Sequence, residues 1–185
     1  RVGFEGAAGL YGIEPDILTF GKIIGGGMPV GAYAASREIM ENVAPVGPVY
    51  QAGTLSANPV AMAAGFATLT ELLKPGFYES LEAKTASFTA RLQDFCDQKG
   101  YEVTFPHVGS VFWPTFTRKV IHRSDEIDGT RMDYFKKMHL ECLKRGVYFG
   151  PSGYEVGFIS SAHTDSDLDF AARMICESLQ QVFES

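Results

Sequence analysis

Apolar residues follow two different spacings along this chain, and the spacing separates expected strands from expected helices. A short apolar run bounded by turn-forming residues predicts a buried strand at residues 17–20, and alternating small and apolar residues predict a second strand at residues 30–35. The link between them, residues 21–29, is short and shows no helical pattern, which favours an antiparallel pair over a parallel crossover. A weaker helical pattern precedes them at residues 6–11.

Helical spacing follows the strand pair. Asn58 and Pro59 predict a helix start, because asparagine caps a helix and proline fits its first position. This helix is expected to run to about residue 73, and Gly65 inside it indicates close packing. Its apolar stripe is expected to be core and consists of Met62, Phe66, Leu69 and Leu73. Upstream, Ser36 is the expected cap of a short helix at residues 37–43.

A Pro-Gly pair interrupts the chain at residues 75–76, and the pattern beyond it predicts a smaller α+β unit. A long amphipathic helix is expected at residues 78–98. Two later helices are expected, one beginning with a capping box at Thr130 and one capped by residues 164–167. Short strands are expected at residues 101–105, 110–116, 147–149 and 155–160.

Composition narrows the class of protein. Hydrophobic residues make up 45% and charged residues 21% of the 185 positions, which indicates a folded core rather than disorder. The net charge of −6, with no basic run, argues against nucleic-acid binding. We expect no membrane span. The three separated cysteines, Cys96, Cys142 and Cys176, suggest reduced thiols of a cytosolic protein rather than a disulfide framework or a metal site.

The candidate chemistry lies at Lys22, between the first predicted strand and the glycines at residues 25–27. A P-loop is excluded because Asp16 and Ile23 occupy positions that need glycine and Ser/Thr. The dinucleotide fingerprint fails because Val30 stands where its last glycine belongs. Amine chemistry remains, since a desolvated lysine loses its proton more easily and forms a Schiff base with an aldehyde. The alternative is a surface lysine before a flexible loop.

Residues 11–22 and 25–33 resemble the lysine region of class III pyridoxal-phosphate aminotransferases. Two further stretches, residues 50–59 and 146–152, resemble the aminomutase branch of that class more particularly. The resemblance runs from about residue 3 to residue 183. It implies an α/β fold of the type I aminotransferase kind, with pyridoxal 5′-phosphate or pyridoxamine 5′-phosphate as the cofactor.

The resemblance also implies a domain division. Residues 1–75 would be the carboxy-terminal part of the large, cofactor-binding domain, and residues 76–185 the small carboxy-terminal α+β domain. The chain has no initiator methionine, and residues 1–4 resemble mid-domain sequence, so we expect a carboxy-terminal portion of a longer protein. The aspartate that binds the cofactor's pyridine nitrogen in this family would precede Arg1.

Four residues receive roles from the resemblance. Lys22 would form the Schiff base with pyridoxal phosphate and, once released, move a proton between substrate and cofactor. Gly53 and Thr54 would bind the cofactor's phosphate, with Thr54 supplied by the neighbouring subunit, which implies a homodimer. Glu155 would lie near the substrate, although it fits a solvent-facing strand position equally well. The family usually has phenylalanine where Tyr154 stands.

The implied activity is that of an isomerase, an intramolecular aminotransferase. It would convert the small molecule glutamate-1-semialdehyde to 5-aminolevulinate for tetrapyrrole biosynthesis, in the cytoplasm or, in a plant, in the plastid stroma. One alternative is another class III ω-aminotransferase. A second is an inactive folded portion that lacks the amino-terminal half of the site, in which residues 1–75 are poorly stable and residues 76–185 fold alone.

Other reactive residue types have structural interpretations. The histidines lack the spacing of metal ligands, and all four, His107, His122, His139 and His163, are expected to be structural. His163 is expected to form a local hydrogen bond at a helix entry. Ser56 and Ser152 lack the glycine-flanked elbow of a serine hydrolase. Trp113 is expected in the core.

Overall fold

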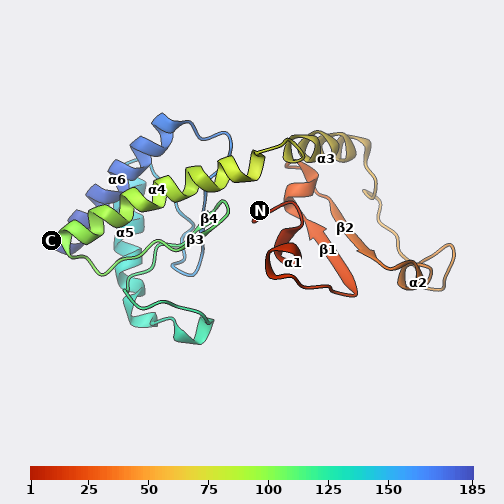
Figure 1. Cartoon of the computed structure of the whole chain (residues 1–185), viewed down its shortest axis with the longest axis horizontal. Coiled ribbons are helices and arrows are strands. Elements are labelled where there is room, and N and C mark those ends of the chain that lie inside the picture. The colour runs from red at the N-terminus through yellow and green to blue at the C-terminus, as the bar shows by residue number, and fades with distance from the viewer. The chain divides into compact units, whose positions relative to one another are not determined.

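The computed structural model describes residues 1–185 and divides into two compact units, Arg1–Tyr78 and Glu79–Ser185. The division falls inside helix α4 (Phe77–Lys99), close to the predicted boundary after residue 75 (Figure 1). That the first unit is the end of a cofactor-binding domain stays a prediction. None of the helices is both long enough and apolar enough to span a membrane.

Unit 1 (Arg1–Tyr78) is built on an antiparallel strand pair, as predicted. Strands β1 (Ile17–Gly21) and β2 (Gly31–Ala35) pair in register from Ile17 opposite Ala35 to Gly21 opposite Gly31. The link between them contains a 3-10 turn, η1 (Lys22–Gly25), where no helical structure was expected. The remaining elements are helices α1 (Gly6–Tyr11), α2 (Arg37–Met40) and α3 (Pro59–Leu72).

The helix caps of unit 1 follow the sequence prediction. The Asn58 side chain accepts hydrogen bonds from the backbone N–H groups of Val60 and Ala61, at 3.0 and 3.3 Å. The Ser36 hydroxyl accepts one from Ile39 at the start of α2. Each cap satisfies backbone donors that have no partner within their own helix.

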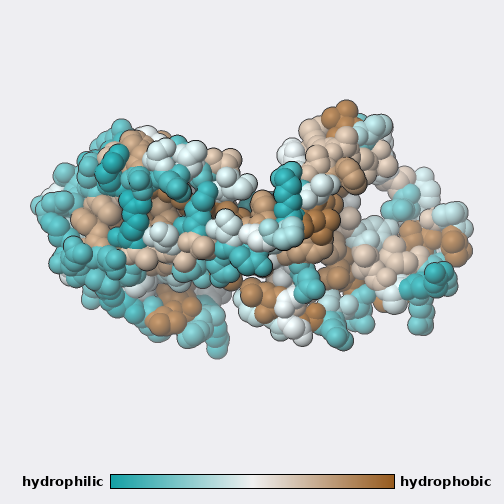
Figure 2. Space-filling model, turned by 45° about the horizontal axis from the view of Figure 1, so that its top comes forward, coloured by the Kyte–Doolittle hydropathy of each residue, from teal (hydrophilic) through white to brown (hydrophobic).

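The predicted burial in unit 1 is wrong. Strand β1 is largely exposed, and Phe66 and Leu73 of the α3 stripe are 76% and 63% exposed. Only Gly25, Ala61 and Gly65 are buried among residues 1–78. The apolar pattern marks a face suited to burial, but unit 1 supplies no second layer to cover it. In Figure 2, hydrophobic residues accordingly gather at several places on the visible surface.

Unit 2 (Glu79–Ser185) has a hydrophobic core between helices and a small sheet. Its helices are α4, α5 (Met132–Lys144) and α6 (Asp165–Glu184), with short turns η2 (Ser124–Glu126) and η3 (Gly129–Arg131). The sheet has the order β3-β4-β5 with antiparallel neighbours, and its strands are β3 (His107–Val108), β4 (Val111–Phe112) and β5 (Gly157–Phe158).

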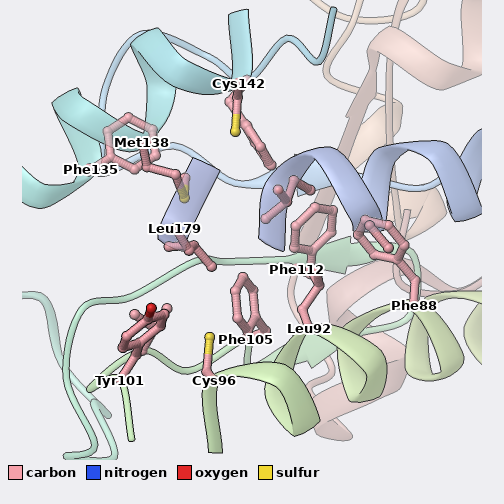
Figure 3. Close-up of a cluster of buried hydrophobic side chains, with 14 of the residues drawn as sticks. Phe88, Leu92, Cys96, Tyr101, Phe105, Phe112, Phe135, Met138, Cys142 and Leu179 are labelled. Carbon is pink, nitrogen blue, oxygen red and sulfur yellow. The ribbon is translucent and has the colours of Figure 1, made fainter. Parts of the chain in front are cut away.

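The core of unit 2 takes side chains from all three helices. Figure 3 shows Leu92 of α4, Met138 of α5 and Leu179 of α6 among the buried residues, and each is fully buried. Aromatic rings close one end of this core, where the ring of Phe183 stacks on Tyr101 at 4.5 Å and on Tyr134 at 5.2 Å between centroids. Burial of this kind stabilises each large side chain by about 1.5–3 kcal/mol.

Several strands predicted in unit 2 are wrong or too long. Residues 101–105 and 147–149 form no strand, while 110–116 and 155–160 keep only Val111–Phe112 and Gly157–Phe158. The side chains of Tyr101, Val103 and Phe105 do alternate into the core, but only Thr104 pairs, with Thr115. The alternation of apolar and polar residues therefore indicated which side chains are buried here, not a hydrogen-bonded strand pair.

The two predicted helix starts of unit 2 have different outcomes. The predicted cap of α6 is confirmed, and the structure shows it to be a capping box. The Thr164 hydroxyl accepts from the Asp167 N–H, and the Asp167 carboxylate accepts from the Thr164 N–H. The box at Thr130 is wrong. There the Asp128 carboxylate accepts from the Thr130 N–H and caps η3, and α5 begins only at Met132.

We expect hydrogen exchange to separate the two units. Amides of the β1–β2 pair should exchange roughly 100-fold or more faster than those of α5 and α6, because unit 1 has no buried apolar core. Exchange on the full chain, followed by mass spectrometry, measures this. Leu179→Ala should speed exchange in unit 2 and leave the β1–β2 amides unchanged. Equally strong protection of both units would contradict the prediction.

We expect Glu184 to contribute stability that disappears in acid. Its carboxylate accepts from Gln180, Tyr101 and Lys99, and these bonds lower its pKa from 4.5 to about 2. A lowered pKa in the folded state stabilises unit 2 above about pH 4.5, and this contribution is lost as the pH falls toward 2. Urea unfolding of Glu184→Gln should therefore show a shallower loss of stability over that range.

The control for this measurement is Glu177→Gln, because Glu177 makes one longer contact, 3.7 Å, to Arg145. Its unfolding should follow the acid dependence of the unchanged chain. If Glu184→Gln also kept that dependence, the hydrogen bonds to Glu184 would not be linked to folding.

Candidate functional site

Lys22 occupies an unusual backbone position directly after β1. Its φ of +52° lies in the left-handed region, which costs a residue with a side chain about 1–2 kcal/mol. The side chain is exposed, and its amine forms no hydrogen bond or ion pair. Unit 1 thus presents a primary amine without a partner, and the dry surroundings expected for a reactive lysine are not formed by this unit itself.

Two glycines allow the turn that carries Lys22 to pack closely against helix α3. A Cβ atom on Gly65 would stand 2.5 Å from the carbonyl oxygen of Ile24, and one on Gly26 would stand 2.5 Å from the carbonyl oxygen of Ala64. Both distances are shorter than any real Cβ contact. Gly26 also has a φ of +58°, and its backbone N–H donates to the Ile23 carbonyl at 3.0 Å, which ends the turn. The close packing predicted at Gly65 is confirmed.

A hollow of about 580 Å³ opens beside Lys22 and belongs to unit 1 alone. Its walls are mainly apolar, with Phe4, Phe20, Ile24 and Leu69 among them. This volume lies within the range of about 300–1,000 Å³ that small-molecule sites occupy. No carboxylate lines it, so a partner for a positively charged ring nitrogen is not present there.

Gly53 and Thr54 lie in a second hollow of unit 1, of about 620 Å³, whose lining includes Gln51 and Ser56. The Ser56 N–H donates to the Gly53 carbonyl at 3.0 Å, which folds this loop just before helix α3. Hydroxyl and backbone donors near a helix start suit a phosphate group. The two hollows share no lining residue, so the structure does not bring Lys22 and Thr54 together within one site of this chain.

Glu155 lies in unit 2, in a loop rather than the predicted strand. Its carboxylate rests against the backbone of Gly150, where a Cβ atom would stand 2.0 Å from one carboxylate oxygen. The residue is exposed and lines a hollow of about 750 Å³, together with Tyr148 and Phe158. Its nearness to a substrate stays a prediction.

Sequence reasoning missed a contact that holds the Glu155 loop. The indole N–H of Trp113, expected in the core, donates to the Gly153 carbonyl at 2.8 Å, and the ring is half-buried. Gly153 is buried against Met132 and Phe135 and has no room for a side chain. The need of an indole N–H for a partner was the available signal, but its partner depends on the tertiary fold.

The remaining reactive side chains have structural surroundings. The Ser160 N–H donates to Nδ1 of His163 at 3.1 Å, which confirms the predicted local hydrogen bond. No group of three His, Cys, Asp or Glu side chains is arranged to hold a metal ion. Burial raises the pKa of Cys96 to about 12 and that of Cys142 and Cys176 to about 11, so these thiols are poor nucleophiles.

Comparison with known proteins matches nearly the whole chain. The family model described as Aminotransferase class-III matches residues 2–183. A curated relative from Desulforapulum autotrophicum, named glutamate-1-semialdehyde 2,1-aminomutase, is 50% identical over 169 residues, which are 91% of this chain and 40% of the relative. The chain therefore spans about 40% of the length of that relative.

Solved structures show the same fold. An omega-transaminase from Sphaerobacter thermophilus matches with a TM-score of 0.88 and 25% identity, over 98% of this chain and 42% of that one. A glutamate-1-semialdehyde aminomutase from Pseudomonas aeruginosa PAO1, solved in complex with PMP, matches with a TM-score of 0.83 and 22% identity over the same shares. The predicted fold class is confirmed, and the chain belongs to the class III aminotransferase family.

Proposed function

We propose that the protein carrying this chain is an isomerase that uses pyridoxal phosphate to convert glutamate-1-semialdehyde to 5-aminolevulinate, a tetrapyrrole precursor. The observation that carries the proposal is the unpartnered amine of Lys22 on a strained turn beside an apolar hollow. The 50% identity to a relative named as an aminomutase supports the choice of reaction.

The residues present fit this cofactor in two respects. A primary amine reacts with an aldehyde, so Lys22 Nζ is the group that would hold pyridoxal phosphate covalently. Gly53 and Thr54, which line the second hollow, would supply a backbone N–H group and a hydroxyl for its phosphate. When bound, the cofactor supplies the electron sink for amino exchange. Since the two hollows have no residue in common, we infer that Thr54 serves the site of a neighbouring copy, in a homodimer.

Lys22 would also move protons. A released amine accepts a proton only while neutral, and a lysine in water is charged at neutral pH. The site must therefore exclude water around Lys22, and the walls formed by Phe4, Phe20 and Leu69 contribute part of that shielding. Glu155 would help select the substrate by placing a carboxylate near it, which disfavours ligands that carry a second negative charge.

A second candidate is an ω-aminotransferase. The likeness to the Sphaerobacter omega-transaminase, with a TM-score of 0.88, supports keeping this candidate, since one fold accommodates both reactions. The two candidates differ in their requirement for a second substrate. An aminomutase forms 5-aminolevulinate from the semialdehyde alone, whereas an ω-aminotransferase needs an amine donor together with an acceptor such as pyruvate.

We expect pyridoxal phosphate followed by borohydride to label Lys22. Mass spectrometry of the full chain should find one dominant adduct there, because its amine is free of partners and lies beside a hollow of suitable volume. Lys22→Arg keeps the charge but should abolish that adduct. Lys74, which pairs with Glu71 at 2.6 Å, serves as an internal control. Labelling spread evenly over the lysines would contradict a specific site in this chain.

We expect the protein of full family length to form 5-aminolevulinate from glutamate-1-semialdehyde with no added amine or keto acid. Lys22→Ala should lower the rate by about 10²–10⁴-fold, the usual contribution of a positioned acid–base group. Colorimetric detection of 5-aminolevulinate measures the product. Activity only with an amine–pyruvate pair would instead support the ω-aminotransferase, and equal rates for both variants would exclude Lys22 from the reaction.

A further inference from the structure

We propose that Gly65 of helix α3 is a positioning residue for Lys22. By leaving out a side chain, it lets the backbone of turn η1 rest on the helix, and this contact holds Lys22 in its left-handed conformation. The inference rests on the proposed role of Lys22 and extends it to Gly65, a residue far from Lys22 in the sequence.

The burial pattern of unit 1 points to this contact. Its three buried residues are Gly25 of the turn and Ala61 and Gly65 of the helix. Ala61 and Gly65 are four residues apart, so they lie on one face of α3. A Cβ atom added to Gly65 would stand 3.8 Å from the Cα atom of Gly25. Burial in this unit is therefore concentrated where the Lys22 turn meets α3.

The contact is made by backbone atoms, which leaves it no room to adapt. The Ile24 carbonyl oxygen stands 2.5 Å from the place where a Cβ atom on Gly65 would be. A long side chain there could turn away, whereas a carbonyl moves only if the turn moves with it. Ile24 is two residues from Lys22 in the same turn, so a displaced Ile24 changes the direction in which Lys22 points.

Two local preferences oppose the observed structure. Glycine inside a helix is less favourable than alanine, and a lysine at positive φ is less favourable than one in the α or β region. Strain of this kind persists only where the surrounding structure over-determines it. The η1–α3 contact is that surrounding structure, because it fixes the turn immediately after Lys22.

The test compares two substitutions on α3 with opposite effects on the helix. Gly65→Ala raises helix propensity but introduces the methyl group that meets Ile24. Ala67→Gly lowers helix propensity at an exposed position two residues away that does not line the Lys22 hollow. If Gly65 mattered only for helix stability, Ala67→Gly would be the harmful change. If it positions Lys22, Gly65→Ala would be.

Two readouts on the full chain decide between these outcomes. The first is the yield of the borohydride-reduced pyridoxal phosphate adduct at Lys22, relative to the other lysines. We expect it to fall about tenfold or more in Gly65→Ala and to stay within about twofold in Ala67→Gly, since small displacements of a reacting group have effects of this size. The second is amide exchange at Gly26 and Met28, whose N–H groups bond the carbonyls of Ile23 and Gly25 at 3.0 Å.

We expect these two amides to exchange faster in Gly65→Ala while the β1–β2 amides stay unchanged. No change in exchange or in Lys22 labelling would overturn the inference. So would loss of protection throughout unit 1, because that would make Gly65 a general packing residue. Absence of a Lys22 adduct in the unchanged chain would instead refute the proposed role of Lys22, and amide exchange would still show whether Gly65 holds the turn.

Discussion

The approach of the Lys22 turn to helix α3 is the contact on which unit 1 depends. Strand pairing alone leaves β1 largely exposed, and the apolar stripe of α3 faces outward. What remains buried is backbone against backbone, with Ile24 and Gly25 of the turn on Gly65 of the helix. Lys22, the lysine proposed to react, thus stands on the part of this unit whose geometry is most restricted.

Unit 2 is stabilised in a different way. Helices α4, α5 and α6 bury large side chains together, and stacked rings at Phe183 close the end of that core. Cavities or overpacking in such a core cost stability at any of many positions. The two units therefore depend on different packing contacts. In unit 2 they are distributed over many buried side chains, whereas in unit 1 they are concentrated at a few glycines.

The sequence predicted the features that depend on neighbouring residues. The antiparallel pair, the Asn58 cap and the cap at the start of α6 all follow from short-range rules and are present. The position of Lys22 after a strand was likewise predictable. Its positive φ was not predictable. We infer that this conformation depends on contact with Gly65 of α3, a residue far away in the sequence.

Errors arose where a pattern has two structural explanations. Alternation at Tyr101, Val103 and Phe105 describes buried side chains without a ladder, since hydrogen bonding requires a partner strand that the pattern does not specify. The stripe that includes Phe66 describes a face suited to burial without saying what covers it. Gly65 signalled close packing, but only the three-dimensional structure shows that its neighbour is the turn carrying Lys22.

The cysteines of unit 2 offer a way to measure how its core opens. Cys96 lies on α4, Cys142 on α5 and Cys176 on α6, so each core helix carries one thiol. Their raised pKa values suppress the thiolate while the core is closed. A thiol reagent therefore records opening events at the two buried thiols, Cys96 on α4 and Cys142 on α5. Comparing these two modification rates distinguishes a core that opens as one cooperative body from one whose helices detach singly.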